Sequence, residues 1–136
     1  MVTSRYLMAE DYDTLLKSLA QDEFHKNTVP EFFVEPETIT LVYSDEKGIV
    51  LFLRGKGIEE DGKRLLRLDI QFLDNFDGKR NLKVMLDGFP KLAKQAKDNK
   101  FSEIHFDSNV ELMRRFCIKR LGFVEGIDDN LVYVID

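Results

Sequence analysis

The spacing of apolar residues divides the chain into segments with the period of a strand and segments with the period of a helix. Residues 3–8 fit a short strand. From Asp11 onward the apolar positions follow the spacing of one helix face: Tyr12, Leu15, Leu16, Leu19 and Ala20. This pattern breaks between residues 21 and 36, where we expect a short helix around Pro30.

Three strands in series are predicted in the middle of the chain. Residues 38–44 alternate between apolar and polar side chains, and residues 49–54 form the apolar run of a strand covered on both faces. In residues 65–72, apolar side chains alternate with Arg67, Asp69 and Gln71, which predicts one apolar and one polar face. The stretch 55–63 contains three glycines and is predicted to be a polar hairpin loop.

The period changes twice in the last part of the chain. From Lys79 the apolar residues mark one face of a helix of about five turns, with a kink expected at Pro90 because proline removes a backbone hydrogen bond. Residues 102–107 form a strand. A second helix follows, with Asn109 as its cap and Gly122 as its end, and residues 123–135 form a hairpin.

This order of elements defines the expected fold. The segment from Leu65 to Asp107 is a strand, a helix and a strand, and such crossovers are right-handed and join parallel strands. We therefore predict a single α/β (α+β) domain over residues 1–136, with a mixed sheet of six to seven strands and helices on both faces. The apolar spacing also predicts four core residues: Phe106, Met113, Phe116 and Cys117.

Composition excludes several classes of protein. Hydrophobic residues make up 43% and charged residues 33% of the 136, which supports a packed core rather than disorder. No apolar run approaches the roughly 20 residues of a membrane-spanning helix, and no secretory signal is visible, so we expect no membrane partner. Cys117 is the only cysteine, which fits a reducing, cytoplasmic setting.

Charge is distributed unevenly along the chain. The net charge is −5, but residues 79–120 hold 11 Lys and Arg against 5 Asp and Glu, a balance of +6, so the remainder carries −11. The negative total argues against nucleic-acid binding, which depends on neutralising phosphates. The basic segment could receive a small anionic ligand, or its lysines could be the solvated face of a helix.

The order of the elements, together with the ending Lys119-Arg120-Leu121-Gly122-Phe123, resembles the GNAT superfamily of N-acetyltransferases. The resemblance covers nearly the whole chain and implies a single GNAT-like domain with acetyl-CoA as its cofactor. In that family, the start of the helix after the fourth strand cradles the pyrophosphate, as helix N-termini favour anions. The resemblance implies that five residues hold the cofactor: Gly78, Lys79, Arg80, Asn81 and Asn109.

Two departures from the family pattern suggest an eroded site. The family's loop has a second small residue where this chain has Arg80-Asn81-Leu82. Many members also place a tyrosine, which protonates the departing thiolate, where this chain has Ile118. Unless Tyr43, Tyr12 or Tyr133 substitutes, that route is absent, and the resemblance implies a weakly active or inactive acetyltransferase.

Candidates for a general base are few. The resemblance implies that Asp69 accepts the proton of the amine, while a solvated or salt-bridged aspartate beside Arg67 or Gln71 is the alternative. His105 is a conceivable base for Cys117, but a structural histidine and a core cysteine are the simpler interpretations. Neither His25 nor His105 has the paired spacing of metal ligands, so no metal site is expected.

A second hypothesis is a non-catalytic GNAT-like interaction or structural protein. Residues 78–99 resemble, more loosely, a GNAT-like internal virion protein of tailed phages, which would imply host cytoplasm or virion as the location. As an enzyme, the protein would act on a cationic amine, since the acidic remainder of the chain attracts cations. As an interaction module, its partner would be another protein.

Overall fold

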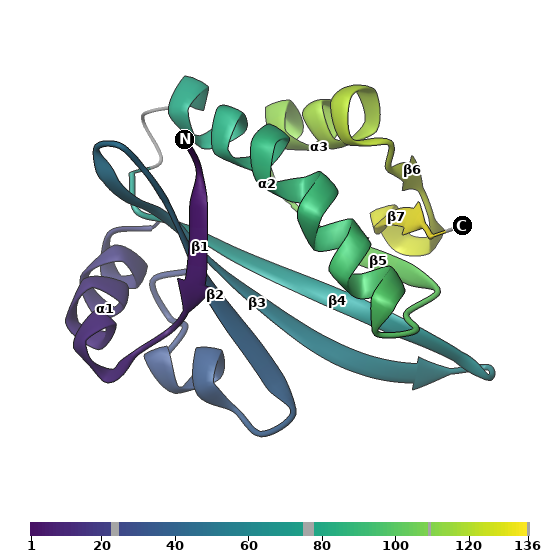
Figure 1. Cartoon of the computed structure of the whole chain (residues 1–136), viewed down its shortest axis with the longest axis horizontal. Helices are drawn as coiled ribbons and strands as arrows, with labels where there is room; N and C mark the ends of the chain where they lie inside the picture. The colour runs from purple at the N-terminus through teal and green to yellow at the C-terminus, as the bar shows by residue number, and fades with distance from the viewer. Residues whose placement is uncertain (23–24, 75–77, 109, 136) are drawn as a thin grey trace.

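The computed structural model of this protein describes residues 1–22, 25–74, 78–108 and 110–135. Its seven strands form one sheet in the order β1-β2-β3-β4-β5-β7-β6 (Figure 1). The strands are β1 (Thr3–Tyr6), β2 (Thr38–Asp45), β3 (Gly48–Glu60), β4 (Lys63–Phe72), β5 (Glu103–Phe106), β6 (Val124–Glu125) and β7 (Leu131–Val134). The helices are α1 (Tyr12–Gln21), α2 (Gly78–Asp98) and α3 (Glu111–Phe116), with shorter turns η1 (Ala9–Asp11), η2 (Pro30–Val34), η3 (Cys117–Leu121) and η4 (Ile127–Asp129).

The sheet is mixed because one pair of strands is parallel. β4 and β5 pair in parallel, from Leu65 opposite Glu103 to Leu68 opposite Phe106, and α2 makes the crossover between them. The other neighbouring strands pair antiparallel. The structure thus confirms the predicted parallel pair and the mixed sheet of six to seven strands.

Helices cover both faces of the sheet, as predicted. On the first face, here called the α2 face, residues such as Leu51, Leu53, Leu68 and Ile70 pack with α2 and with the segment from α3 to η3. On the opposite face, the α1 face, α1 and η2 enclose a smaller core. That core comprises Leu15, Leu19, Phe33, Val42 and Phe52. β3 is buried on both sides because its successive side chains alternate between these two cores.

α2 lies close to the sheet at a glycine. A Cβ atom added to Gly88 would come within 2.7 Å of Cε2 of Tyr43, so a residue with a side chain would force this buried ring to move. α2 continues through Pro90 as one helix to Asp98. Although α2 is 21 residues long, none of the described helices is apolar enough over a sufficient length to cross a bilayer.

The predicted polar loop over residues 55–63 is wrong. β3 continues to Glu60 and β4 begins at Lys63, so the turn consists of Asp61 and Gly62. Gly55 lies inside the strand, where an added Cβ would stand 3.2 Å from Leu66 Cδ1. Glycine within a strand often marks such a close approach rather than a loop.

The helix before the terminal hairpin also differs in detail from its prediction. Its predicted cap, Asn109, lies outside the described residues. α3 widens into the π turn η3, and Gly122 ends the helix with φ of 88°. Met113, Cys117 and Leu121 are buried at a spacing of four residues, which the wider turn brings into line, whereas Phe116 is only half-buried.

The core on the α1 face can be tested by truncation. Phe52 is completely buried, so Phe52→Ala should lower the free energy of unfolding by about 3–5 kcal/mol through lost burial and a residual cavity. Ile39 of β2 is 57% exposed, so Ile39→Ala serves as the control and should cost less than about 1 kcal/mol. Urea unfolding followed by circular dichroism measures both. Similar losses in the two variants would contradict the assignment of the faces.

Candidate functional site

The end of β4 has a hydrogen-bonding edge that none of the described strands covers. β4 pairs with β3 along its whole length but with β5 only over Leu65–Leu68. The carbonyl of Arg64 accepts from Ser102 N–H on the β5 side, whereas Leu73 N–H donates to Val50 on the β3 side. Because backbone groups alternate along a strand, the N–H groups of Ile70 and Phe72 point to the uncovered side.

An uncovered strand edge can bind an extended ligand through main-chain hydrogen bonds. The carbonyl of Phe72 is already used, because it accepts hydrogen bonds from Ser18 Oγ at 2.8 Å and from Gln71 Nε2 at 2.9 Å. What remains for a ligand on this edge is a short row of main-chain groups at residues 70 and 72. We call this row the open edge of β4.

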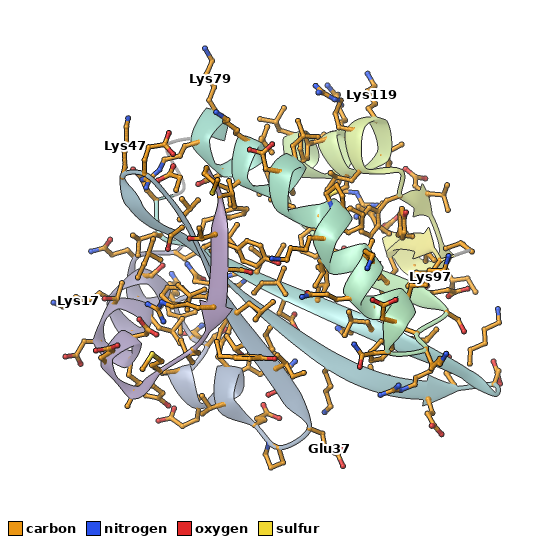
Figure 2. The ribbon with its side chains drawn as sticks, in the orientation of Figure 1. Lys17, Glu37, Lys47, Lys79, Lys97 and Lys119 are labelled. Atoms are coloured by element: carbon orange, nitrogen blue, oxygen red, sulfur yellow. The ribbon has the colours of Figure 1, made fainter. Side chains whose placement is uncertain are left out.

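The N-terminus of α2 follows this edge in the sequence. Its first turn contains no acidic residue, so the positive end of the helix dipole is not neutralised from within. An added Cβ at Gly78 would meet nothing within 4 Å, which leaves the backbone approachable. Lys79 is exposed and extends from the end of the helix into solvent (Figure 2). These features suit an anion.

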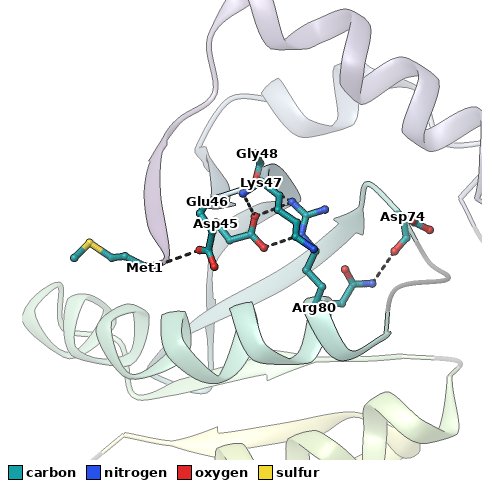
Figure 3. Close-up of polar contacts among 8 residues, drawn as sticks. Met1, Asp45, Glu46, Lys47, Gly48, Asp74 and Arg80 are labelled. Atoms are coloured by element: carbon teal, nitrogen blue, oxygen red, sulfur yellow. Dashed lines mark hydrogen bonds and ion pairs between the residues drawn. The ribbon is translucent and has the colours of Figure 1, made fainter.

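Arg80, predicted to contact the cofactor, holds a carboxylate of the protein. Its Nε and Nη2 donate to the two oxygens of Asp45 at 2.7 Å each, and Nη2 also reaches the carbonyl of Gly48 at 3.3 Å (Figure 3). This pairing lowers the pKa of Asp45 well below the usual range of an aspartate, chiefly through the hydrogen bonds from Arg80. It ties α2 to the turn between β2 and β3. We call it the Asp45–Arg80 clasp.

Asn81 has a similar structural contact. Its side chain is buried, and Nδ2 donates to the carbonyl of Asp74 at 2.9 Å, which joins the first turn of α2 to the residues after β4 (Figure 3). Of the residues predicted to hold the cofactor, Gly78 and Lys79 therefore present open groups, while Arg80 and Asn81 bind other parts of the chain. Asn109 lies outside the described residues.

Asp69 lies on the α1 face and is salt-bridged, although not to the partners considered from the sequence. Arg54, which is only 3% exposed, donates from Nη1 to Oδ2 of Asp69 at 3.0 Å. The same guanidinium donates from Nε to the carbonyl of Phe32 at 2.7 Å, and its Cζ stacks 3.8 Å from the centre of the Phe32 ring. Its Nη2 lies 3.6 Å from Oε2 of Glu35. A buried cation requires such partners, so one oxygen of Asp69 has a structural role.

A polar cluster that the sequence analysis missed lies at the end of β4. Gln71 is fully buried on the α1 face, and its Nε2 donates to Ser18 Oγ at 3.0 Å and to Asp22 Oδ2 at 3.1 Å. Its Oε1 lies 2.6 Å from Nδ1 of His25. These residues come from α1, the loop after it and β4. Gln71 lies on the polar face of the predicted strand, and nothing in the local sequence indicates that this polar side chain is buried.

The three tyrosines considered as substitutes for the acid missing at Ile118 lie in different surroundings. Tyr43 is buried beneath α2, and burial raises its pKa to about 12. It lines an apolar cavity of about 30 Å³ together with Ile70 and Cys117, which is room for little more than one water molecule. Tyr133 packs its ring against Phe89 at 5.0 Å. Tyr12 has its pKa raised, chiefly by desolvation.

The pairing of Cys117 with His105 is excluded. Cys117 is fully buried on the α2 face, and this burial raises the pKa of its thiol to about 12. His105 points to the other face, where Nε2 contacts Glu103 at 2.9 Å and Nδ1 contacts the Asn130 amide at 2.8 Å. Among the residues described, no group of three or more His, Cys, Asp or Glu is placed to hold a metal ion.

A larger groove of about 950 Å³ lies at the opposite end of the α2 face. Its walls come from β1 and from the second half of α2, including Tyr6, Lys91 and Gln95, and its floor includes Ile39 and Leu66. The β4 residues that line it, Arg64, Leu66 and Leu68, belong to the part of β4 that pairs with β5. The groove is therefore separate from the open edge.

Comparison with solved structures identifies the fold. Aminoglycoside acetyltransferase AAC(6')-Ib, in complex with coenzyme A and kanamycin, superposes with a TM-score of 0.69 at 15% identity, over 98% of this chain and 95% of that one. An aminoglycoside N(6')-acetyltransferase from Legionella pneumophila gives 0.72 at 9% identity, over 98% and 92%. A GNAT-family acetyltransferase from Streptococcus pneumoniae gives 0.69 at 12%, over the whole of both chains.

The protein therefore has the fold of GNAT acetyltransferases, as the order of its elements suggested. Neither family models nor curated proteins match the sequence. At such low identity the superpositions establish the arrangement of the chain, and the chemistry has to be argued from its own residues.

The burial of Cys117 predicts that its thiol reacts slowly in the native protein. Native protein at pH 8 should react with a thiol-specific aromatic disulfide at least about 100-fold more slowly than protein unfolded in urea, because the thiolate is the reactive form. Release of the coloured thiol measures both rates. Rapid stoichiometric labelling of the native protein would show that the helix carrying Cys117 is placed wrongly.

The Asp45–Arg80 clasp predicts a pH dependence of stability. A carboxyl whose pKa is lowered by folding stabilises the protein above its unfolded pKa, about 3.9, and this contribution is lost as the pH falls below that value. Asp45→Asn should therefore lower the Tm at pH 7, and its difference from the parent should narrow below about pH 4. A difference in Tm that stays constant between pH 7 and pH 3 would contradict the pairing.

Proposed function

We propose that this protein transfers an acetyl group from acetyl-CoA to an amine. The observation that carries this proposal is the open edge of β4, which leads directly in sequence to the approachable N-terminus of α2 in a chain with the GNAT fold. In similar proteins solved with coenzyme A, the fold accommodates this ligand. The residues present fit its two chemical parts, an extended amide chain and a pyrophosphate.

The pyrophosphate would lie at the backbone of Gly78 and Lys79, with the Lys79 ammonium as its cation. The open edge would align the amide chain, and an N–H group of Ile70 or Phe72 would polarise the thioester carbonyl where charge develops. Arg80 and Asn81 would join this site by exchanging their present contacts, and Asn109 stands as a further proposed contact. Asp69 is the proposed proton acceptor.

The acceptor class follows from charge. The chain outside residues 79–120 has a balance of −11, so its field would attract a cationic amine. The aminoglycoside kanamycin, bound by one protein of similar fold, is an amine of this class. A cationic amine is therefore the proposed substrate class.

The Asp45–Arg80 clasp favours a second candidate, a non-catalytic GNAT-fold protein that binds another protein. With Arg80 engaged and Ile118 unable to donate a proton, two features expected of an active enzyme are altered. The resemblance to a phage virion protein stays a prediction under this hypothesis. Calorimetric titration with acetyl-CoA and CoA distinguishes the two functions: micromolar binding supports the enzyme, and no binding at millimolar ligand supports the interaction protein.

Paired charge removal tests the anion site. The double variant Lys79→Ala/Arg80→Ala would lose the charge-assisted contact of Lys79, about 1.5–3 kcal/mol, and the part of the Arg80 contact that exceeds its pairing with Asp45, so its affinity for CoA should fall at least tenfold. Lys94→Ala/Lys97→Ala removes the same charge at the other end of α2 (Figure 2 labels Lys97) and should bind CoA like the parent. Equal losses in both variants would indicate a general charge effect and not a site.

A further inference from the structure

The cluster at the end of β4 determines which nitrogen of His25 carries a proton. The Gln71 amide is oriented by its surroundings, since Nε2 faces the acceptors Ser18 Oγ, Asp22 Oδ2 and the Phe72 carbonyl. Its Oε1 is therefore the atom that faces His25. Nδ1 of His25 lies 2.6 Å from this oxygen and 3.3 Å from Asp22 Oδ2. With two acceptors around it, Nδ1 must be the protonated nitrogen of the neutral ring.

The other ring nitrogen is consequently a proton acceptor. Nε2 of neutral His25 carries a lone pair, and within the described part of the chain it has no hydrogen-bond partner. The side chain is 40% exposed, so solvent or a substrate can reach it. An imidazole whose Nδ1–H is held by an amide oxygen, with a carboxylate 3.3 Å away, and whose Nε2 is accessible has the arrangement of a general base.

The second histidine of the chain has the opposite arrangement. Nδ1 of His105 accepts from the Asn130 amide, and Nε2 lies 2.9 Å from Glu103 Oε1 and so carries the proton. Both of its nitrogens are thus engaged, and the ring has no lone pair to offer. Asp69, the other candidate base, gives one oxygen to the buried Arg54.

The position of His25 matches the proposed chemistry. Its partner Gln71 lies between Ile70 and Phe72, whose N–H groups form the open edge of β4. The basic nitrogen therefore lies over the α1 face of the strand end along which the thioester would lie. His25 also follows α1 closely, and α1 is fastened to this strand end by Ser18 Oγ at the Phe72 carbonyl.

We propose that His25, in place of Asp69, is the general base of the acetyl transfer, and this rests on the proposed function. Nε2 takes the proton that the attacking amine nitrogen loses as its bond to the acetyl carbon forms and the carbon–sulfur bond breaks. The sulfur leaves as a thiolate, which takes a proton from the imidazolium or from water. Asp22 and Gln71 are positioning residues that hold the ring and its tautomer.

Kinetics test the role of His25 against the matched control at His105. The assay follows acetyl transfer from acetyl-CoA to kanamycin and to spermidine. His25→Gln should lower kcat by about 10²–10⁴-fold, the usual contribution of a general base, with the KM for acetyl-CoA changed less than about threefold. His105→Gln should keep kcat within about threefold of the parent. Unchanged kcat in His25→Gln, with a large loss in Asp69→Asn, would overturn the proposal in favour of Asp69.

A second measurement needs no activity. Long-range ¹⁵N–¹H correlation spectra of the parent at pH 8 should show His25 protonated on Nδ1 and His105 on Nε2, and Asp22→Asn should shift His25 away from a single tautomer. An Nε2–H tautomer at His25 would overturn the proposal. If the parent protein acetylates neither amine, both the proposed function and the role of His25 are contradicted. If the parent and the His25→Gln variant are equally active, only the role of His25 is contradicted.

Discussion

The early end of the pairing between β4 and β5 is the constraint on which the rest of the structure depends. β4 pairs with β3 over its whole length, so its last residues keep strand geometry although none of the described strands pairs with them on the other side. A hydrogen-bonding edge without a partner is costly inside a protein and useful at its surface. The crossover helix starts just beyond this edge, so main-chain donors and a helix dipole come close together without any side chain having to supply them.

The second organising feature is a polar layer inside the α1 face. Arg54 and Gln71 occupy positions that would carry apolar residues in a plain sheet, and each is satisfied by groups from more than one element. Such buried networks stabilise little on balance, but they fix orientation, because each donor has few alternative partners. Here they connect η2, α1 and β4, so the segments that flank the proposed reaction centre are located by hydrogen bonds as well as by packing.

The sequence predicted what depends on periodicity and missed what depends on contacts between distant segments. The parallel pair, the crossover helix and the inward residues Ile104 and Phe106 follow from spacing alone. The extension of β3 beyond Gly55 was missed because glycine indicates a turn and a close approach equally well. The clasp between Asp45 and Arg80 spans 35 positions, and no local pattern indicates which cation a carboxylate will meet. The cluster around Gln71 was missed for the same reason.

Because of the Asp45–Arg80 clasp, binding of an anionic ligand at this arginine would be an exchange of one anion for another. A phosphate that reaches the guanidinium would have to displace the Asp45 carboxylate. The net free energy of binding would therefore be the difference between the phosphate–arginine and the carboxylate–arginine interaction, which are similar in size. Displacement would also release the turn between β2 and β3 from α2, which would couple occupancy of the helix end to the freedom of this turn. Toward such a ligand, the clasp would be an internal competitor whose strength is set by the protein and not by the concentration of any solute.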